Sequence, residues 1–227
     1  MEEIAWKDLL GWGDEQIEEV DGVLLDLGVS SMQFDQKERG FSFRAEGPLD
    51  MRMDSSEETA TAREIVNTWS EQRLAELFRE YGEEPRWRKA ALAIVARRKK
   101  KKIETAQELA DIVAKALGTR LRKKRHPATL IFQALRLAVN RELEHVQEGV
   151  AKALHFLSVH GRMGVLSFHS LEDRIVKNLF RAAAKPLEKY ADPLFHLVTK
   201  KPRVPHLAEV RRNPRARSAK LRAIEKT

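Results

Sequence analysis

The sequence predicts an α/β fold, and two observations carry that prediction. Residues 20–28 and 161–170 are short, continuous apolar runs, which is the pattern of strands buried on both faces of a sheet. Helical patterns fill most of the chain between and after these runs, an arrangement typical of α/β domains. Hydrophobic residues make up 42% of the 227 residues, enough for a packed core, so wholesale disorder is excluded.

Four helices are predicted after a polar, turn-rich loop at residues 36–58. Their apolar spacing and their start and stop residues place three of them at about 59–69, 70–82 and 105–118, and the other begins near residue 85 and runs into the basic tract 97–102. The last one opens with Thr105 and Glu108, the spacing of a capping box, and ends at Gly118.

A long apolar stripe from Ile131 to Leu157, in steps of three or four residues, predicts a helix or helix pair over 129–157. A helix is expected at 171–184 and a strand at 195–199. We therefore divide the chain into three parts: 1–35 and 129–227 form the two parts of the α/β domain, and 36–128 form a helical insertion between them.

The composition excludes several classes of protein. The chain has no cysteine, which rules out disulfides and cysteine–zinc sites. Its acidic start does not resemble a secretory signal, and no apolar run approaches the roughly 20 residues that cross a bilayer. We expect a soluble, cytoplasmic protein.

Positive charge is concentrated in two blocks. Residues 85–126 hold fifteen Lys and Arg against three acids, and residues 201–222 hold eight against one. Such blocks indicate binding to a polyanion, most often nucleic acid, with an anionic membrane surface or a simple solvated surface as alternatives. The candidate RNA-binding residues are Arg97, Arg98, Lys99, Lys100, Lys101, Lys102, Arg122, Lys123, Lys124, Arg125, Arg215, Arg217 and Lys220.

Candidate chemistry lies where the two apolar runs end. Asp26 closes the first run, at the edge of the sheet where α/β proteins bind ligands, although the spacing alone favours a turn or helix cap formed by Asp26 or Ser30. His169 closes the second, as a proton carrier, an RNA contact or a structural residue. Asp50 and Asp54 are four residues apart without a third ligand nearby, so no metal site is predicted.

Several long, ordered motifs resemble the RsmH (MraW) family. The resemblance covers about residues 20–223, and Met32 departs from it where many members have proline. The motifs lie at residues 21–35, 39–44, 47–54, 81–84, 132–143, 167–174 and 213–222.

The resemblance implies a class I (Rossmann-like) methyltransferase fold with an inserted all-helical substrate-recognition domain. It implies S-adenosyl-L-methionine as cofactor, with Asp26 and Gln33 at the positions that contact it. The implied substrate is the N4 amine of a cytidine in the decoding region of small-subunit (16S) ribosomal RNA, and the implied partner is the small ribosomal subunit. No catalytic base is assigned.

The family's upstream strand, Gly-rich turn and acidic residue have no counterpart before residue 20. We therefore expect an N-terminally truncated fold and little or no methyltransferase activity from this chain alone. The competing hypothesis is a non-catalytic ribosomal-RNA-binding protein derived from the same family, which cofactor titration distinguishes from the enzyme.

Overall fold

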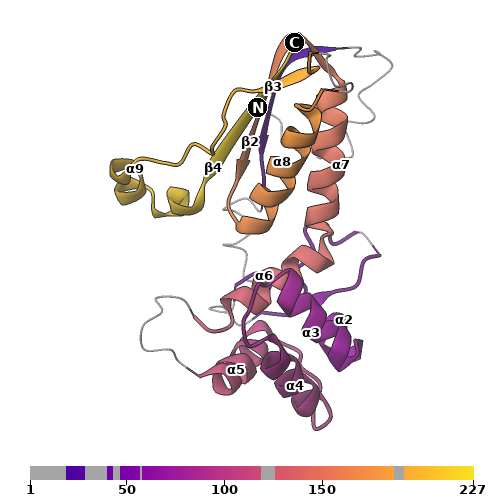
Figure 1. Ribbon diagram of the computed structural model, residues 1–227. Coiled ribbons are helices and arrows are strands. Elements are labelled where there is room, and N and C mark those ends of the chain that lie inside the picture. Colours follow the sequence, from indigo (N-terminus) through magenta and orange to yellow (C-terminus); the bar gives the residue numbers. More distant parts are fainter. Residues whose placement is uncertain (1–18, 29–39, 43–46, 57, 119–125, 187–191) are drawn as a thin grey trace. The chain divides into compact units, whose positions relative to one another are not determined.

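The computed structural model of the 227-residue chain describes residues 19–28, 40–42, 47–56, 58–118, 126–186 and 192–227 (Figure 1). Contacts divide the chain into two compact units, one made of residues 1–28 and 143–227 and the other of residues 29–142. The second unit includes residues 129–142, which lie outside the 36–128 insertion expected from the sequence.

The first unit contains a four-stranded sheet, which confirms the mixed α/β architecture. Its strands are β1 (Val20–Asp26), β2 (Leu157–Ser167), β3 (Phe195–Leu197) and β4 (Lys220–Lys226). Their order in the sheet is β1-β2-β4-β3, with β1 parallel to β2 and the other neighbours antiparallel. The parallel pair sets the carboxyl ends of β1 and β2 side by side.

Two helices share the core of this unit with the sheet (Figure 1). Val150 of α7 (Glu142–His155) and Phe180 of α8 (Ser170–Ala183) are fully buried in one cluster with Leu25 and Val165 of the strands. Leu24, which points to the opposite side of β1, is 71% exposed. The described residues therefore cover one face of β1, whereas the sequence predicted burial on both.

The segment between β3 and β4 leaves the sheet as an arm (Figure 1). It contains α9 (Leu207–Arg212) and the 3₁₀ helix η3 (Pro214–Ser218). Paired backbone hydrogen bonds between Arg203 and Leu221, of 2.8 and 2.9 Å, close its base. Strand β4 was missed from the sequence, where its residues were assigned to a basic tail. We call residues 203–219 the arm.

The second unit is helical: α2 (Ala62–Thr68), α3 (Glu71–Glu80), α4 (Trp87–Arg98), α5 (Ala106–Leu117) and α6 (Thr129–Val139). The predicted capping box is present, since the Thr105 hydroxyl accepts from the Glu108 amide and the Glu108 carboxylate accepts from the Thr105 amide. The long apolar stripe forms the pair α6 and α7. Helix α4 ends at Arg98, within the basic tract 97–102 into which the predicted helix runs. Within the described ranges, no helix is long and apolar enough to cross a membrane.

Asn140 fixes the loop that precedes α2 to the end of α6. Its side-chain nitrogen donates to the carbonyl of Met51, and its oxygen accepts from the Met53 amide at 2.6 Å. Between these anchors Met51 is fully buried with a φ of 67°, a backbone conformation that costs free energy in a non-glycine residue. The Asp50 carboxylate accepts three hydrogen bonds from Arg52, so both of its oxygens help to stabilise this turn.

Candidate functional site

The carboxyl ends of β1 and β2 bring together the two sequence segments singled out for chemistry. Asp26 pairs with Leu166 across the parallel strands, and the Leu27 amide donates to the Leu166 carbonyl at 3.0 Å. Asp26 therefore lies beside the segment that leads from β2 through His169 into α8. This edge is where open α/β sheets bind ligands.

Asp26 carries a carboxylate that no described cation neutralises. Its side chain is exposed, and no cation among the described residues pairs with it. Partial burial raises the pKa of Asp26 above its ordinary value, and the nearby Glu172 carboxylate raises it further. A ligand with N–H or O–H donors, or with positive charge, would relieve both effects.

Glu172 is the buried neighbour that the sequence analysis did not assign to the site. One of its carboxylate oxygens accepts from the backbone amides of Phe168, at 2.9 Å, and His169, at 3.2 Å. Its side chain is 1% exposed. The positive end of the α8 dipole and these two donors favour an ionised carboxylate at this position.

His169 is the N-cap of α8, so it has a structural role, while its roles as a proton carrier or an RNA contact stay predictions. Its Nδ1 accepts from the Glu172 amide at 3.3 Å and completes a capping box. Its Nε2 lies 3.0 Å from the second Glu172 oxygen. The spacing His169-x-x-Glu172 is the signal that would have predicted this pair, but histidine is a rare capping residue.

Gly28, two residues after Asp26, has a φ of 100°, in the left-handed region of backbone conformation. A Cβ added there would meet its nearest heavy atom, the Glu172 Oε1, at an ordinary 3.8 Å. Backbone conformation, rather than crowding, therefore requires glycine where the chain turns away from the sheet.

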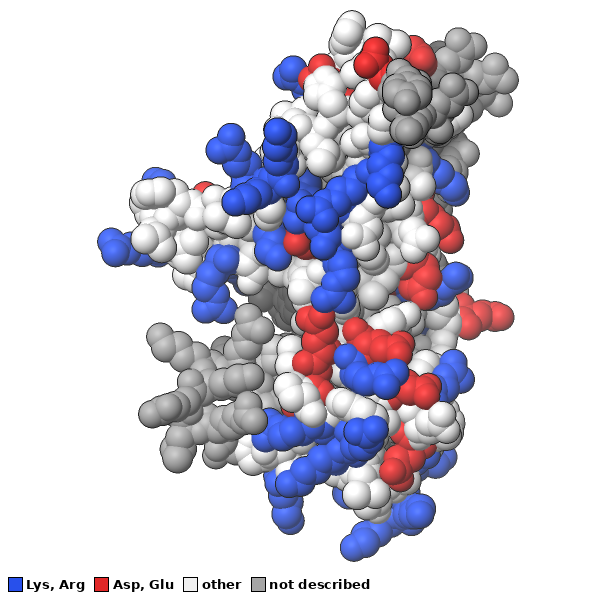
Figure 2. Space-filling view, in the orientation of Figure 1, with Lys and Arg blue, Asp and Glu red and all other residues white. Residues whose placement is uncertain are grey.

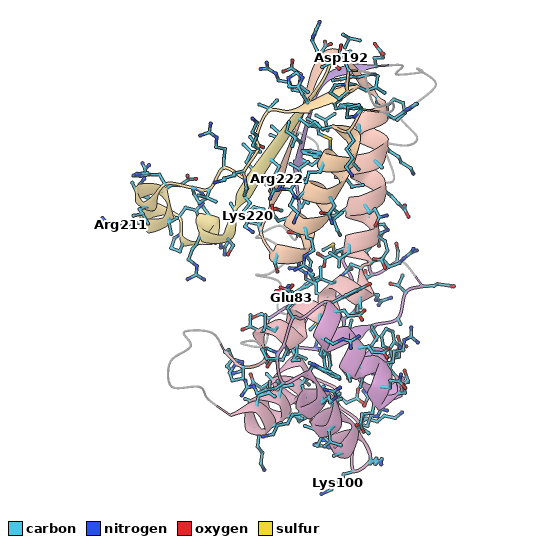
Figure 3. The ribbon with its side chains drawn as sticks, viewed as in Figure 1. Glu83, Lys100, Asp192, Arg211, Lys220 and Arg222 are labelled. Carbon is cyan, nitrogen blue, oxygen red and sulfur yellow. The ribbon has the colours of Figure 1, made fainter. Side chains whose placement is uncertain are left out.

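The basic segment after α4, defined as residues 97–102 and so including the last two residues of α4, divides into structural and exposed residues. The Arg98 guanidinium donates to the Val66 carbonyl and Arg97 donates to the Lys101 carbonyl, both at 2.8 Å. Lys99, Lys100 and Lys102 are exposed, as is Lys101, whose amine lies 3.6 Å from Glu108. Figure 3 shows Lys100 at the far end of the helical unit. Of the other candidates, Gln33, Arg122, Lys123, Lys124 and Arg125 lie outside the described residues.

The C-terminal basic residues also take different roles. Arg215 and Arg217 are exposed on η3 in the arm, which carries the further exposed arginines Arg211 and Arg212 (Figure 3). Lys220 lies on β4 with its amine 3.2 Å from an Asp173 oxygen.

Arg222 also lies on β4. It is buried and forms two hydrogen bonds with Asp173, of 2.7 and 3.2 Å. Part of the basic block at 201–222 is thus engaged in a buried structural contact.

The sequence model described as the MraW methylase family matches residues 7–227. The chain belongs to this family. Relatives named ribosomal RNA small subunit methyltransferase H include proteins from Picosynechococcus sp., 51% identical over 211 residues, and Carboxydothermus hydrogenoformans, 47% identical over 219 residues. Each alignment covers 92% of this chain, and 68% and 70% of the respective relative. The protein from Thermomicrobium roseum is 51% identical over 217 residues, 91% of this chain and 66% of its own. The chain thus spans about two thirds of these relatives.

Membership in a methylase family implies S-adenosylmethionine as the methyl donor. The described residues fit such a cofactor, because Asp26 offers an exposed acceptor without a cationic partner at the sheet edge where ligands bind. A sulfonium compound with an ammonium group and ribose and adenine donors suits that carboxylate.

Proposed function

We propose that this protein takes part in methyl transfer from S-adenosylmethionine to N4 of a cytidine in the decoding region of small-subunit ribosomal RNA. The observation that carries the proposal is the exposed carboxylate of Asp26, at the carboxyl end of a parallel strand in a chain that belongs to a methylase family. The relatives' names support ribosomal RNA of the small subunit as the substrate.

Asp26 and Gln33 are the proposed cofactor contacts. Asp26 accepts hydrogen bonds from the cofactor's donors, and the cofactor supplies an electrophilic methyl group on a positively charged sulfur. Gln33 follows seven residues later, on the segment that continues from Gly28. The buried Glu172 holds the start of α8 against the end of β2, and so fixes the wall beside Asp26.

The reacting nitrogen is a poor nucleophile, because its lone pair is conjugated with the cytosine ring. S-adenosylmethionine, held by Asp26 and Gln33, would supply the methyl group to N4, and N4 would release one proton to solvent. Positioning therefore contributes most of the rate. Backbone carbonyls near Gly28, with Asp26 beside them, are proposed acceptors for the N4 hydrogens, and the base must first be unstacked from its RNA.

Two groups of exposed cations, one in each unit, are the proposed RNA contacts. In the helical unit these are Lys99, Lys100 and Lys102, and in the first unit the arginines of the arm. Figure 2 shows Lys and Arg side chains gathered on the arm and at the end of the helical unit. Arg97 and Arg98 are better assigned to holding the end of α4, because their guanidinium groups bind backbone carbonyls.

Calorimetric titration with S-adenosylmethionine tests the cofactor site. Asp26→Ala should weaken binding by about 1–3 kcal/mol, the loss of a charge-assisted hydrogen bond. Glu148→Ala is the matched control, since it removes an exposed carboxylate from α7 in the same unit. No binding by the unaltered chain, or equal losses in both variants, would contradict the assignment.

Salt-dependent binding to a small-subunit ribosomal RNA fragment tests the RNA contacts. Replacing Lys99, Lys100 and Lys102 with Met should weaken binding and flatten the dependence of log affinity on log salt by about two to three, since three phosphate contacts are lost. Replacing Lys152 and Lys185, exposed lysines of the other unit, should change neither quantity appreciably. An unchanged slope in the triple variant would remove the segment after α4 from the RNA-binding surface.

A further inference from the structure

A shallow groove runs over α3 and the first turn of α4, within the helical unit. Its volume is about 520 Å³, and its polar and aromatic lining consists of Glu71, Gln72, Glu76, Arg79, Trp87 and Arg88. None of these residues belongs to the basic segment after α4 or to the strand-end site.

An aromatic–cation stack forms one wall of the groove. Trp87 is half-buried and packs against the helical core. The Arg88 guanidinium carbon lies 3.8 Å from the centroid of its ring, and that of Arg79 lies 5.5 Å away. Arg79 is paired with Glu80 at 2.8 Å, whereas Arg88 has no carboxylate partner among the described residues. A guanidinium held flat on an indole keeps its outer face and N–H edge available to a planar ligand.

The lining residues of α3 also offer hydrogen-bond acceptors. Glu71 and Glu76 are exposed on α3, and the Gln72 amide donates to Glu76 at 3.1 Å, which orients that carboxylate. The lining thus combines two carboxylates with two guanidinium groups. A phosphate would be repelled by the acids, and a simple cation by the arginines. A flat neutral ligand that carries both donors and acceptors interacts favourably with both kinds of group.

Guanine is the nucleobase whose edge matches this lining. Its O6 and N7 atoms accept from an arginine, and its N1–H and amino group donate to a carboxylate. Its ring stacks on a guanidinium plane or an aromatic face, as unpaired bases in RNA commonly do.

We propose that this groove binds an unpaired guanine of an RNA, with Arg88 stacked on Trp87 as its platform and Glu71 or Glu76 as its acceptor. The inference rests on the proposed function, because it assumes an RNA substrate. It adds a sequence-reading site to contacts that otherwise recognise only phosphate.

Three pentanucleotides test the proposal with the unaltered chain: UUGUU, UUUUU, and UUGUU with inosine in place of guanosine. Each is labelled, and binding is followed by fluorescence anisotropy at low salt. UUGUU should bind about tenfold more tightly than UUUUU, the range expected for one stacked and hydrogen-bonded base. The inosine oligonucleotide should lose most of this preference, because it lacks the amino group that reaches the carboxylate.

Two variants connect the preference to the groove. Arg88→Lys keeps the charge but loses the planar stack, and the double change Glu71→Gln with Glu76→Gln keeps the size but loses the negative charge. Both should bring UUGUU to the affinity of UUUUU. Arg73→Lys is the matched control: Arg73 is stacked on Trp69 at 3.5 Å in the same unit, and neither residue lines the groove. Circular dichroism checks that each variant is folded.

Equal binding of the three oligonucleotides by the unaltered chain, or a preference that survives in both variants, overturns the proposal. Either result would leave the proposed function standing if S-adenosylmethionine and the ribosomal RNA fragment still bind. Failure of the ribosomal RNA fragment itself to bind would instead contradict the proposed function.

Discussion

Two aspartates of the first unit lie in neighbouring parts of the same fold and have opposite electrostatic surroundings. Asp26, at the end of β1, has no cationic partner among the described residues, and burial together with Glu172 raises its pKa. Asp173, in the first turn of α8, accepts from Arg222 and Lys220. Burial alone would raise the pKa of Asp173, but these hydrogen bonds outweigh it and lower the pKa.

The difference separates a carboxylate that stabilises the fold from one that does not. Asp173 joins α8 to β4, a strand more than 45 residues further along the chain, through bonds buried inside the unit. Asp26 makes no comparable contact, so the folded state keeps its charge at a cost. A carboxylate whose charge costs folding free energy, at an edge of the sheet where ligands bind, is a candidate for a functional role. A carboxylate paired with buried cations is explained by its contribution to the fold.

The largest expected effect comes from breaking the paired site. Asp173→Ala leaves the buried Arg222 without its carboxylate, and the free energy of unfolding should fall by about 3–5 kcal/mol. Urea denaturation followed by circular dichroism measures it. The double variant Asp173→Leu with Arg222→Met should recover much of the loss, because it leaves no unpaired buried charge. A single variant as stable as the unaltered chain would show that this ion pair contributes little.

The second largest change in stability is expected at Glu172, whose carboxylate is a neighbour of both Asp26 and Asp173. Glu172→Gln keeps an acceptor for the amides of Phe168 and His169 but removes the negative charge, so stability should fall by only about 1–2 kcal/mol. The pKa of Asp26 should fall toward its ordinary value without reaching it, since burial is the larger cause of its shift. Carbon NMR of the Asp26 carboxyl group measures this. An unchanged Asp26 titration would show that the two carboxylates are not coupled.

The sequence predicted the elements that local patterns define, and missed those that depend on contacts between distant residues. Strand β1 and helix α8 were predicted within a few residues, because apolar runs and helical spacing are local patterns. Strand β4 was missed because its alternation, Leu221-Arg222-Ala223-Ile224, includes an arginine on the buried side. A charged residue predicts exposure unless its partner is known, and Asp173 is 49 residues away.

The site shows the same limit. Asp26 was singled out because it follows an apolar run, but its neighbour Glu172 lies in a different part of the sequence and enters only through the parallel pairing of β1 with β2. The basic segment after α4 was treated as uniform, although Arg98 donates to the Val66 carbonyl. Composition predicts where charge is abundant, and only tertiary contacts show which of those charges are already engaged.

A smaller change, an increase in stability, is expected when the charge of Asp26 is removed. The folded-state pKa of Asp26 is raised, so its contribution to stability is most favourable below the ordinary value of 3.8 and is lost as pH rises through the raised value. Asp26→Asn should therefore leave stability nearly unchanged in acid and increase it at neutral pH, by less than about 1 kcal/mol because solvent screens an exposed group. Paired denaturation curves from pH 3 to pH 7 measure the difference, whereas a loss of stability at neutral pH would assign Asp26 a structural role.

The smallest expected effect separates the two cations of the Asp173 site. Arg222 is buried and holds both carboxylate oxygens, whereas the Lys220 side chain is 35% exposed and contacts one of them at 3.2 Å. Lys220→Met should therefore reduce stability by about 0.5 kcal/mol or less at low salt, and by less still in 1 M salt, since exposed ion pairs are weak and screened. Because its charge is already engaged with Asp173, the same change should weaken binding to the ribosomal RNA fragment less than Arg217→Met, which removes an exposed arginine of the arm. If Lys220→Met weakened RNA binding as much as Arg217→Met, Lys220 would have to leave Asp173 to bind phosphate. The RNA-binding cations would then extend from the arm into β4 as far as Lys220.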